Sequence, residues 1–470
     1  MDIKVSSKDI VWNYAGVIAS LGGNLLMLPI VLYFLSGAEV GLWYVFQSMA
    51  SLSNMFDFGF TPTFSRNVAY CWSGANKLQR ENVSYSEGKK VNYVLLKQII
   101  YTCRYIYLLI SIIVLIGFST AGTAYIFHVS GELNGYSHMI AWAIWCLALF
   151  LNLYYGYFAS LLKGVGAVAE SNKVMVIART AQLIILVAML LLKTGLIGVS
   201  VSYITYGVIL RLLYKYYFYR YKSIGKNLNE TQYKPVKDDI LKLFKTIWHN
   251  AWKEGAVSFA NYFCNQMGTI VSSLYLSLEE TGVYSMGVQL ATAVVTFAYA
   301  MYTSYQPSLQ SAISNREETR VKKDFAYTVF VYIIITIIGT AAVVVIGRPV
   351  IRLIKPEMNI GVGIMLGVSF YQFILKFRNC YTSYLSNSNR IIYFRAFMIF
   401  AIVCVGLEFL LCGVFNMGMW GLVIAQVVSQ MIYNVWHWPL VVHRELNMNL
   451  YELLKLGFLE TRNKLIKRHV

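Results

Sequence analysis

Apolar stretches long enough to cross a lipid bilayer dominate this chain of 470 residues. A helix needs about 20 mostly apolar residues to cross the hydrocarbon core. Hydrophobic residues make up 57% of the chain and charged residues 13%, against roughly 45–50% and about 25% in soluble domains. This composition excludes a soluble enzyme, a disordered chain and a disulfide scaffold. The length of the stretches excludes an outer-membrane barrel, whose strands alternate over about 10 residues.

The stretches predict an all-α polytopic membrane protein with twelve transmembrane helices. Helix-length apolar windows, rather than short alternating ones, give the assignment. The predicted spans are residues 11–34, 40–70, 99–127, 139–162, 174–192, 197–214, 255–276, 283–307, 325–347, 361–385, 393–413 and 418–440.

Lys and Arg are distributed unevenly over the predicted loops. If successive loops alternate between the two sides, the side of the N-terminus holds 30 of the 40 basic residues and the opposite side 4, with 6 inside spans. The positive-inside rule then places both termini in the cytoplasm. Topology thus explains most of the net charge of +18, and the sequence does not call for a nucleic-acid partner.

A weak internal repeat indicates two similar halves. Residues 35–43 match residues 276–284 at Leu, Ser, Glu and Gly. Six helices per half give both halves the same orientation, which is typical of parallel-repeat transporters. We therefore expect two six-helix lobes around a central cavity. The predicted parts are an N-terminal lobe 1–222, a basic cytoplasmic linker 223–254, a C-terminal lobe 255–440 and a cytoplasmic tail 441–470.

Polar side chains recur along one face of four predicted helices. Interhelical hydrogen bonds would explain one such stripe. Four stripes favour a water-filled cavity, because amides facing lipid are costly. The polar residues that we expect to line this cavity are Gln47, Asn54, Asn261, Asn265, Gln289, Thr296, Gln306, Gln372 and Asn379.

Basic residues inside spans usually face a cavity or extend to the lipid headgroups. We expect Arg179 and Arg211 to extend to the headgroups and Lys376, on a polar stripe, to face the cavity. A positive cavity would attract an anion, and Arg binds phosphate through a bidentate fork. The candidate ligands for an anionic headgroup are Arg66, Arg104, Lys376 and Arg378.

Two acids lie inside predicted spans, Asp57 and Glu408. Each is a candidate for coupling transport to H+ or Na+. A helix cap or ion pair would equally explain Asp57, and a structural role would equally explain Glu408. The histidines are scattered and no CxxC pair occurs, so we predict no metal site, no catalytic residue and no cofactor.

The segment 28–69 resembles the first hairpin of Wzx-type O-antigen flippases, which belong to the multidrug/oligosaccharidyl-lipid/polysaccharide (MOP) exporter superfamily. The resemblance is carried by Leu35, the run Glu39-x-Gly41-Leu42-Trp43, Asp57-x-Gly59 and Arg66. It implies a six-plus-six bundle that works by alternating access.

The resemblance also implies a substrate and a location. The substrate would be an undecaprenyl-diphosphate-linked oligosaccharide, moved from the cytoplasmic to the periplasmic face of the bacterial inner membrane for O-antigen or another surface polysaccharide. Arg66, Lys376 and Arg104 would contact the diphosphate. Candidate partners are membrane lipids, a polysaccharide polymerase and chain-length machinery.

Two other functions compete with this interpretation. A cation-coupled multidrug exporter of the same superfamily would need cavity carboxylates, whereas this sequence offers mostly cations. A membrane-embedded polysaccharide polymerase or acyltransferase would need acids, bases or metal ligands gathered on one face. The short non-cytoplasmic loops and scattered histidines argue against it, so we expect a transporter and no enzyme.

Overall fold

The computed structural model describes residues 7–72, 75–78, 83–85, 91–131, 133–233, 236–314, 317–387 and 392–466. The chain divides into two compact units, and each is described by itself. Unit 1 comprises Met1–Tyr44 with Phe263–Val470, and unit 2 comprises Val45–Tyr262. The boundaries fall inside α2 (Gly37–Met55) and α11 (Lys237–Tyr275), so they do not follow the lobes predicted from the sequence, which stay a prediction.

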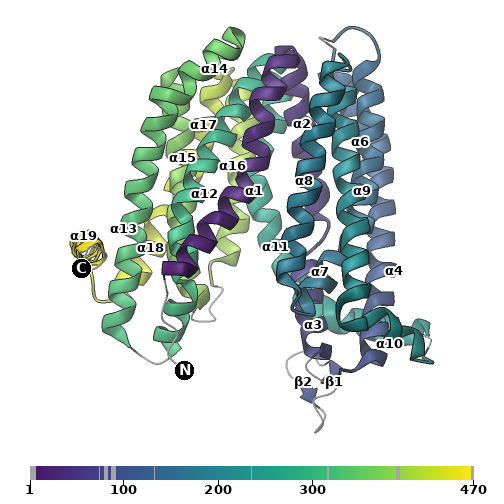
Figure 1. Cartoon of the computed structure of the whole chain (residues 1–470). Helices are drawn as coiled ribbons and strands as arrows, with labels where there is room; N and C mark the ends of the chain where they lie inside the picture. The colour runs from purple at the N-terminus through teal and green to yellow at the C-terminus, as the bar shows by residue number, and fades with distance from the viewer. Residues whose placement is uncertain are drawn as a thin grey trace. The chain divides into compact units, whose positions relative to one another are not determined.

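Unit 1 is a bundle centred on the long helix α12, which packs against α1, α13 and α15 (Figure 1). Helix α17 packs against α15 and α16. Besides parts of α2 and α11, its elements are α1 (Ser7–Phe34), α12 (Leu278–Ser314), α13 (Glu318–Ala342), the π-helical turn Val343–Gly347, α14 (Arg348–Ile354), the 3-10 turn Pro356–Met358, α15 (Val362–Asn387), α16 (Phe394–Phe409), the π-helical turn Leu410–Val414, α17 (Gly418–Met431), α18 (Asn434–Glu445) and α19 (Leu450–Ile466).

Unit 2 is a second helical bundle, in which α9 packs against α6, α7 and α8, and α4 packs against α6 (Figure 1). Besides parts of α2 and α11, its elements are α3 (Phe60–Trp72), β1 (Ala75–Leu78), β2 (Val83–Tyr85), α4 (Tyr93–Gly117), the π-helical turn Phe118–Gly122, α5 (Thr123–Val129), α6 (Ser137–Tyr154), α7 (Tyr157–Gly164), α8 (Val168–Leu191), α9 (Leu196–Arg220), the 3-10 turn Tyr221–Ser223 and α10 (Ile224–Glu230).

Seven helical segments of the described chain are long and apolar enough to cross a membrane. They are Tyr93–Val129, Ser137–Gly164, Glu170–Leu191, Leu196–Glu230, Leu278–Gln306, Glu318–Ile354 and Phe394–Val414. The other five predicted spans also fall on helices, and one of them contains a shorter apolar helical segment, Leu21–Phe34 of α1. The count of twelve crossings therefore remains part of the proposal below.

The predicted helix 40–70 is wrong in one respect, because it breaks between α2 and α3. Phe58 and Gly59 have positive φ angles of 46° and 70°, which a continuous helix excludes. Glycine adopts this conformation at little cost. The amide N–H of Phe60 donates to the carbonyl of Asp57 at 2.8 Å and restarts the helix. The span is thus two shorter helices joined by a tight turn.

Two further expectations need correction. The fold is not purely helical, because β1 and β2 form an antiparallel hairpin in which Ala75 pairs with Tyr85. The predicted loop-like linker 223–254 is mostly helical: α10 ends at Glu230 and α11 begins at Lys237. Asp238 and Asp239 in the first turn favour that early start, since acids stabilise a helix N-terminus.

The two repeated sequences form the same turn. In the first, the N–H of Ser36 donates to the Glu39 carboxylate at 2.9 Å and the N–H of Glu39 donates to the Ser36 hydroxyl at 3.2 Å. In the second, Ser277 and Glu280 exchange the same pair of bonds, each at 3.2 Å. Both are capping boxes, which start α2 and α12. The two segments are therefore similar in structure as well as in sequence.

The two turns contact one another within unit 1. A Cβ atom on Gly41 would overlap the carbonyl oxygen of Leu278. A Cβ atom on Gly282, the equivalent residue of the second half, would lie 3.0 Å from the Gly41 nitrogen. The Lys355 ammonium closes the first turn by donating to the Leu35 carbonyl at 2.6 Å. Glycine is therefore required where these two turns touch.

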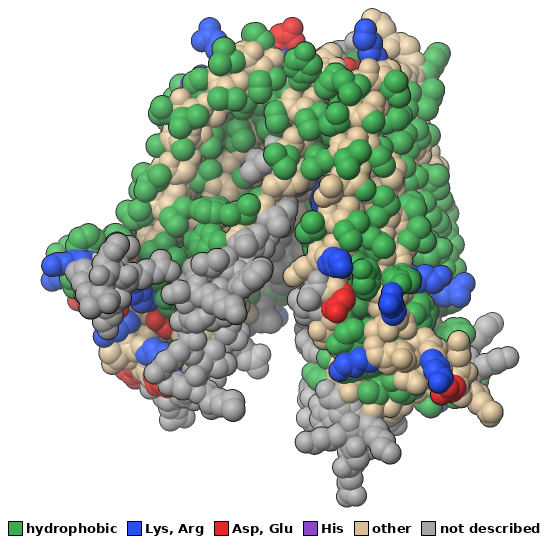
Figure 2. Space-filling view, in the orientation of Figure 1, with side chains coloured by type: hydrophobic (Ala, Val, Ile, Leu, Met, Phe, Trp, Pro, Cys, Tyr) green, Lys and Arg blue, Asp and Glu red, His purple; other side chains and the backbone are tan. Residues whose placement is uncertain are grey.

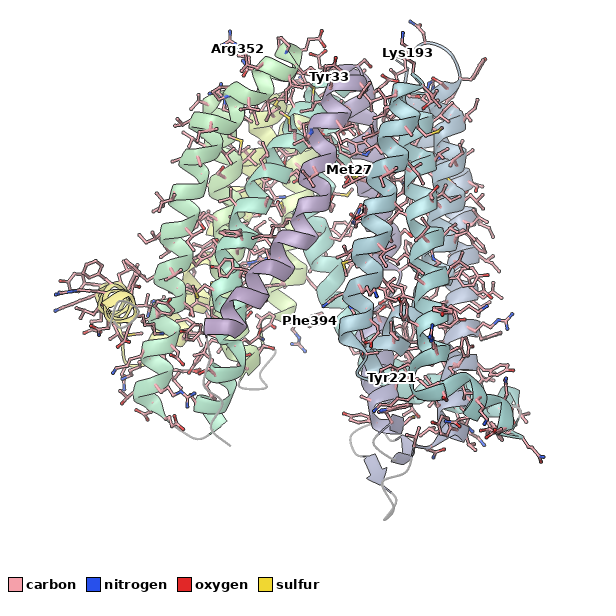
Figure 3. The ribbon with its side chains drawn as sticks, viewed as in Figure 1. Met27, Tyr33, Lys193, Tyr221, Arg352 and Phe394 are labelled. Atoms are coloured by element: carbon pink, nitrogen blue, oxygen red, sulfur yellow. The ribbon has the colours of Figure 1, made fainter. Side chains whose placement is uncertain are left out.

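Apolar side chains cover the visible flank of each unit, and the visible Lys and Arg side chains gather towards the ends (Figure 2). Lys193 lies at the upper end of unit 2, and Tyr221 lies near its lower end (Figure 3). Arg352 lies at the upper end of unit 1 (Figure 3). An apolar flank with charged ends is what a bilayer requires of each bundle.

Candidate functional site

Three of the predicted polar stripes meet on α12 in unit 1. The Tyr44 hydroxyl of α2 donates to Gln289 at 2.5 Å. On the α11 side, the hydroxyls of Thr269 and Ser285 lie 3.0 Å apart. These contacts turn the stripes towards one another rather than towards lipid, as the cost of exposing amides requires.

The stripe of α15 also faces α12. The hydroxyls of Tyr299 and Ser383 lie 2.9 Å apart, and the Gln306 amide donates to Asn387 at 3.2 Å. From α1, the Asn13 amide donates to the carbonyl of Ala300 and to two hydroxyls of the same α12 turn, at 2.8–2.9 Å. The polar face of α12 is thus lined by α1, α2, α11 and α15.

Lys376 projects from α15 towards this polar face. Its ammonium lies 5.4 Å from the centre of the Tyr299 ring, which itself stacks on Tyr302. A cation over a ring face is stabilised by the ring quadrupole. Within the described residues no carboxylate forms an ion pair with Lys376, which is half-buried. It is therefore a positive charge that an anionic ligand could still neutralise.

Arg378 occupies a different setting. Its side chain is 2% exposed, its guanidinium donates to the Gln430 side chain, and it stacks over Phe397 at 3.9 Å. Gln430 in turn accepts from the Asn434 amide at 3.2 Å. These contacts join α15 to α16, α17 and α18, so part of the Arg378 guanidinium is already engaged within the bundle.

Glu408 of α16 is fully buried with an open oxygen. Its Oε1 accepts from the Gln426 amide at 2.9 Å and from the Cys404 thiol at 3.8 Å, while Oε2 has no hydrogen-bond partner among the described residues. A Cβ atom on Gly268 of α11 would lie 3.4 Å from Oε1 and 2.8 Å from the Tyr284 hydroxyl. The carboxyl group therefore lies where four helices of unit 1 meet, and its free oxygen could take a proton or a cation.

Asp57 of unit 2 has no such open oxygen. Oδ2 accepts from the Thr61 amide at 3.0 Å, and Oδ1 accepts from the Thr61 hydroxyl at 2.9 Å and from the Tyr107 hydroxyl. The carboxylate thus holds the break between α2 and α3 and ties it to α4. These bonds match the cap interpretation of Asp57.

The remaining predicted residues are scattered. Arg104 is exposed on α4 and donates to the Tyr154 hydroxyl at 3.3 Å. Gln372 is buried, with 1% exposure, whereas Asn54 is exposed. Half-buried residues are Gln47, Thr296 and Asn379. The side chains of Arg66, Asn261 and Asn265 lie outside the described part of the structure.

The sequence did not indicate that Arg211 of unit 2 is buried. Arg211, expected to extend to the headgroups, is 7% exposed, and its Nε has no hydrogen-bond partner among described residues. Arg179 stacks over Tyr206 at 4.3 Å and donates to Gln182 at 2.9 Å. Glycine at position 207 leaves room for the side chains of Arg211 and Asn152, which both lie close to where a Cβ atom would be. The four-residue step from Gly207 to Arg211 was the available signal, because it puts both on one helical face.

The described ranges contain no group of three or more His, Cys, Asp or Glu that could hold a metal ion.

Comparisons with known proteins agree with this architecture. The family model described as "Polysaccharide biosynthesis protein" matches residues 6–311. An inward-facing multidrug resistance MATE family transporter of the MOP superfamily is similar at TM-score 0.65 and 12% identity, over 95% of this chain and 96% of that one. An outward-facing structure described in the same terms is similar at TM-score 0.58 and 13% identity, over 95% and 100%.

A third similar structure is a MOP superfamily transporter from Pyrococcus furiosus. It is described as having a binding pocket of reverse polarity that suggests a different function. Its TM-score is 0.55 and its identity 12%, over 95% of this chain and 100% of that one. No curated protein matches the sequence.

The fold is that of a helical, multi-pass membrane transporter of the MOP superfamily. The chain belongs to the polysaccharide biosynthesis protein family, whose model covers well over half of its length. The similarity seen in the first hairpin is thereby confirmed at the family level. This family and fold agree with the expectation of a transporter rather than an enzyme.

Proposed function

We propose that the protein moves a lipid-linked oligosaccharide across the bacterial inner membrane, from the cytoplasmic to the periplasmic face. Family membership supports a glycan-linked substrate. The observation that carries the proposal is the half-buried Lys376, which lies against the tyrosine-rich polar face of α12 and has no ion pair among described residues. The proposed substrate is an oligosaccharide linked to undecaprenyl diphosphate, which would be used for O-antigen or another surface polysaccharide.

The physical problem is the headgroup. A sugar diphosphate would lose hydrogen bonds to water at every polar group if it entered hydrocarbon, at several kcal/mol for each. Hydroxyls and amides along α12 would replace that water, and tyrosine rings would stack on sugar faces. A cation would offset the diphosphate charge. The lipid chain would remain in the bilayer.

The proposal includes twelve crossings with both termini in the cytoplasm, and alternating access of two lobes around a central cavity. Its support is the excess of basic residues on one predicted side and the similarity to MOP transporters described in both inward-facing and outward-facing conformations. A polysaccharide polymerase and chain-length machinery are the proposed partners, since they would use the delivered substrate.

The test is delivery of lipid-linked sugar to the periplasmic face in cells that depend on this chain. We expect Lys376→Gln to reduce delivery about tenfold or more and Lys376→Arg to retain most of it, because a charged contact to a ligand contributes roughly 1.5–3 kcal/mol. Lys193→Gln is the matched control, since it removes an exposed cation at the end of unit 2. Unreduced delivery by Lys376→Gln at normal protein levels would refute the anion role.

A multidrug exporter is the second candidate, because similar structures are described as multidrug transporters and Glu408 is a buried acid. That function predicts efflux of cationic dyes that depends on Glu408, with delivery of lipid-linked sugar unchanged when the chain is removed.

A further inference from the structure

Helix α19 differs from every long helix of unit 1 in direction. It is seen along its axis in Figure 1, whereas α13, against which it packs, runs up the picture. Asn449 and Glu452 form a capping box at its start, with both bonds at 2.8 Å. Asn447 has a positive φ of 43°, which allows the chain to turn away from α18.

Several contacts hold α19 on the bundle. A Cβ atom on Gly457 would lie 2.5 Å from Cβ of Phe330, so the helix and α13 touch closely there. The Lys464 ammonium donates to the Tyr305 hydroxyl at 2.9 Å and lies 3.7 Å from the centre of the Tyr327 ring. α19 is therefore a docked element of unit 1.

The level at which α19 crosses α13 can be read from charge. Lys322, Lys323 and Asp324 are followed by no charged residue until Arg348. At 1.5 Å per residue this uncharged stretch is about 35 Å long, enough for a hydrocarbon core of about 30 Å. Gly457 lies against Ala326 and Phe330, near the start of the uncharged stretch of α13. Glu460 pairs with Lys323 at 3.7 Å. α19 thus lies at the edge of the apolar layer.

The outward face of α19 has the composition of a membrane interface. Leu453, Gly457, Glu460 and Lys464 face the bundle at steps of 4, 3 and 4 residues, and the opposite face follows the same steps. That face carries two aromatic and two basic residues, all exposed: Tyr451, Lys455, Phe458 and Arg462.

The flanks of the helix differ as well. Leu450 and Leu454 lie on one flank, with Thr461 between them. The other flank is mixed: the exposed Glu452 and Asn463 lie beside Leu456 and the exposed Leu459. A helix with a mainly apolar flank, a flank that carries polar residues, and aromatic and basic residues between them suits the plane of a bilayer surface, with its cations at the headgroups.

We propose that α19 is an in-plane helix that inserts Phe458 and Tyr451 into the interface and binds anionic lipid headgroups through Lys455 and Arg462. The occupant of its outward face is the lipid surface, because aromatic and basic side chains complement acyl chains and phosphates at that depth. The inference depends on membrane integration and not on the transported substrate.

The test uses the full chain in nanodiscs with one added cysteine that carries a fluorophore, at Phe458 or at Asn463. The described native cysteines are buried, and the unlabelled parent measures background labelling. Lipids brominated in the acyl chain quench a nearby fluorophore. We expect strong quenching at position 458 and weak quenching at 463. Equal, weak quenching at both positions would overturn membrane insertion and point to water or a protein partner.

Lipid charge is tested at the same labelled position. We expect brominated phosphatidylglycerol to quench position 458 at lower mole fraction than brominated phosphatidylcholine, with an enrichment of about fivefold per cation. Lys455→Gln with Arg462→Gln should remove that preference. Lys193→Gln with Arg352→Gln, a matched loss of two exposed cations, should retain it. A preference that survives loss of Lys455 and Arg462 would overturn the headgroup assignment.

Discussion

The two units hold their membrane-embedded acids in opposite ways. Asp57 in unit 2 accepts three hydrogen bonds, which use both carboxylate oxygens. Glu408 in unit 1 accepts from the Gln426 amide and the Cys404 thiol through one oxygen, and its other oxygen has no hydrogen-bond partner in the described part of the chain, although Glu408 is more deeply buried. A satisfied acid stabilises a fold, whereas an open one can exchange a proton or ion during a transport cycle. From this comparison we propose a structural role for Asp57 in unit 2 and a coupling role for Glu408 in unit 1.

The largest effect is expected at Asp57. Asp57→Ala leaves the Thr61 and Tyr107 donors without an acceptor and should lower the stability of the purified protein by roughly 2–4 kcal/mol. Asp57→Asn keeps one acceptor oxygen and should lose less. Thermal unfolding in detergent measures both. An unchanged melting temperature for Asp57→Ala would contradict the structural role of Asp57 and remove its difference from Glu408.

Glu408→Gln should affect transport rather than stability. The amide keeps the shape and the hydrogen bond with Gln426 but cannot exchange a proton or hold a cation. We expect transport driven by a proton or sodium gradient to fall roughly five- to 150-fold, the usual range of coupling between two sites. Uptake into vesicles with and without each gradient checks this. Gradient-dependent transport by a well-folded Glu408→Gln protein would exclude the coupling role.

The buried arginines sharpen the comparison. Arg378→Leu in unit 1 removes a hydrogen bond and a stacked cation, and should cost about 2 kcal/mol. Arg211→Leu in unit 2 removes a buried cation whose Nε has no hydrogen-bond partner among the residues that the structure describes, and should change stability by less than about 1 kcal/mol or increase it. Melting temperatures of the two variants decide the point, and equal losses would argue for an unseen partner of Arg211.

The smallest effect concerns the repeat. Ser36→Ala and Ser277→Ala each remove one capping-box hydroxyl, and each should cost about 1 kcal/mol. The two losses should be alike, because the turns share their hydrogen bonds. A loss confined to one of them would mean that the halves are not equivalent at this position.

Local sequence patterns predicted much of this fold. Apolar stretches located the helices, and the Ser-x-x-Glu spacing at 36–39 and 277–280 identified the repeated turns. Local patterns did not predict features that depend on contacts between residues far apart in the sequence. The break at Phe58 depends on Asp57 bonding to Tyr107 of α4, and the burial of Arg211 depends on helices packed around α9.

The candidate site was predictable only in part. The polar residues that recur along the predicted span 283–307 indicated one polar face, and in the structure that face of α12 meets four other helices. Sequence alone did not separate Lys376 from Arg378, two residues apart on α15. Only the structure shows Gln430 and Phe397 around Arg378, because both lie on other helices.

Reconstitution of the purified chain tests the central claim most directly. Liposomes would contain undecaprenyl-diphosphate oligosaccharide with a fluorescent sugar, and a membrane-impermeant quencher would report the exposed fraction over time. We predict that the full chain raises the rate of exchange between leaflets and that Lys376→Gln lowers this rate, whereas Lys193→Gln does not. Exchange no faster than in protein-free liposomes, from protein that is folded by its melting curve, would contradict the account.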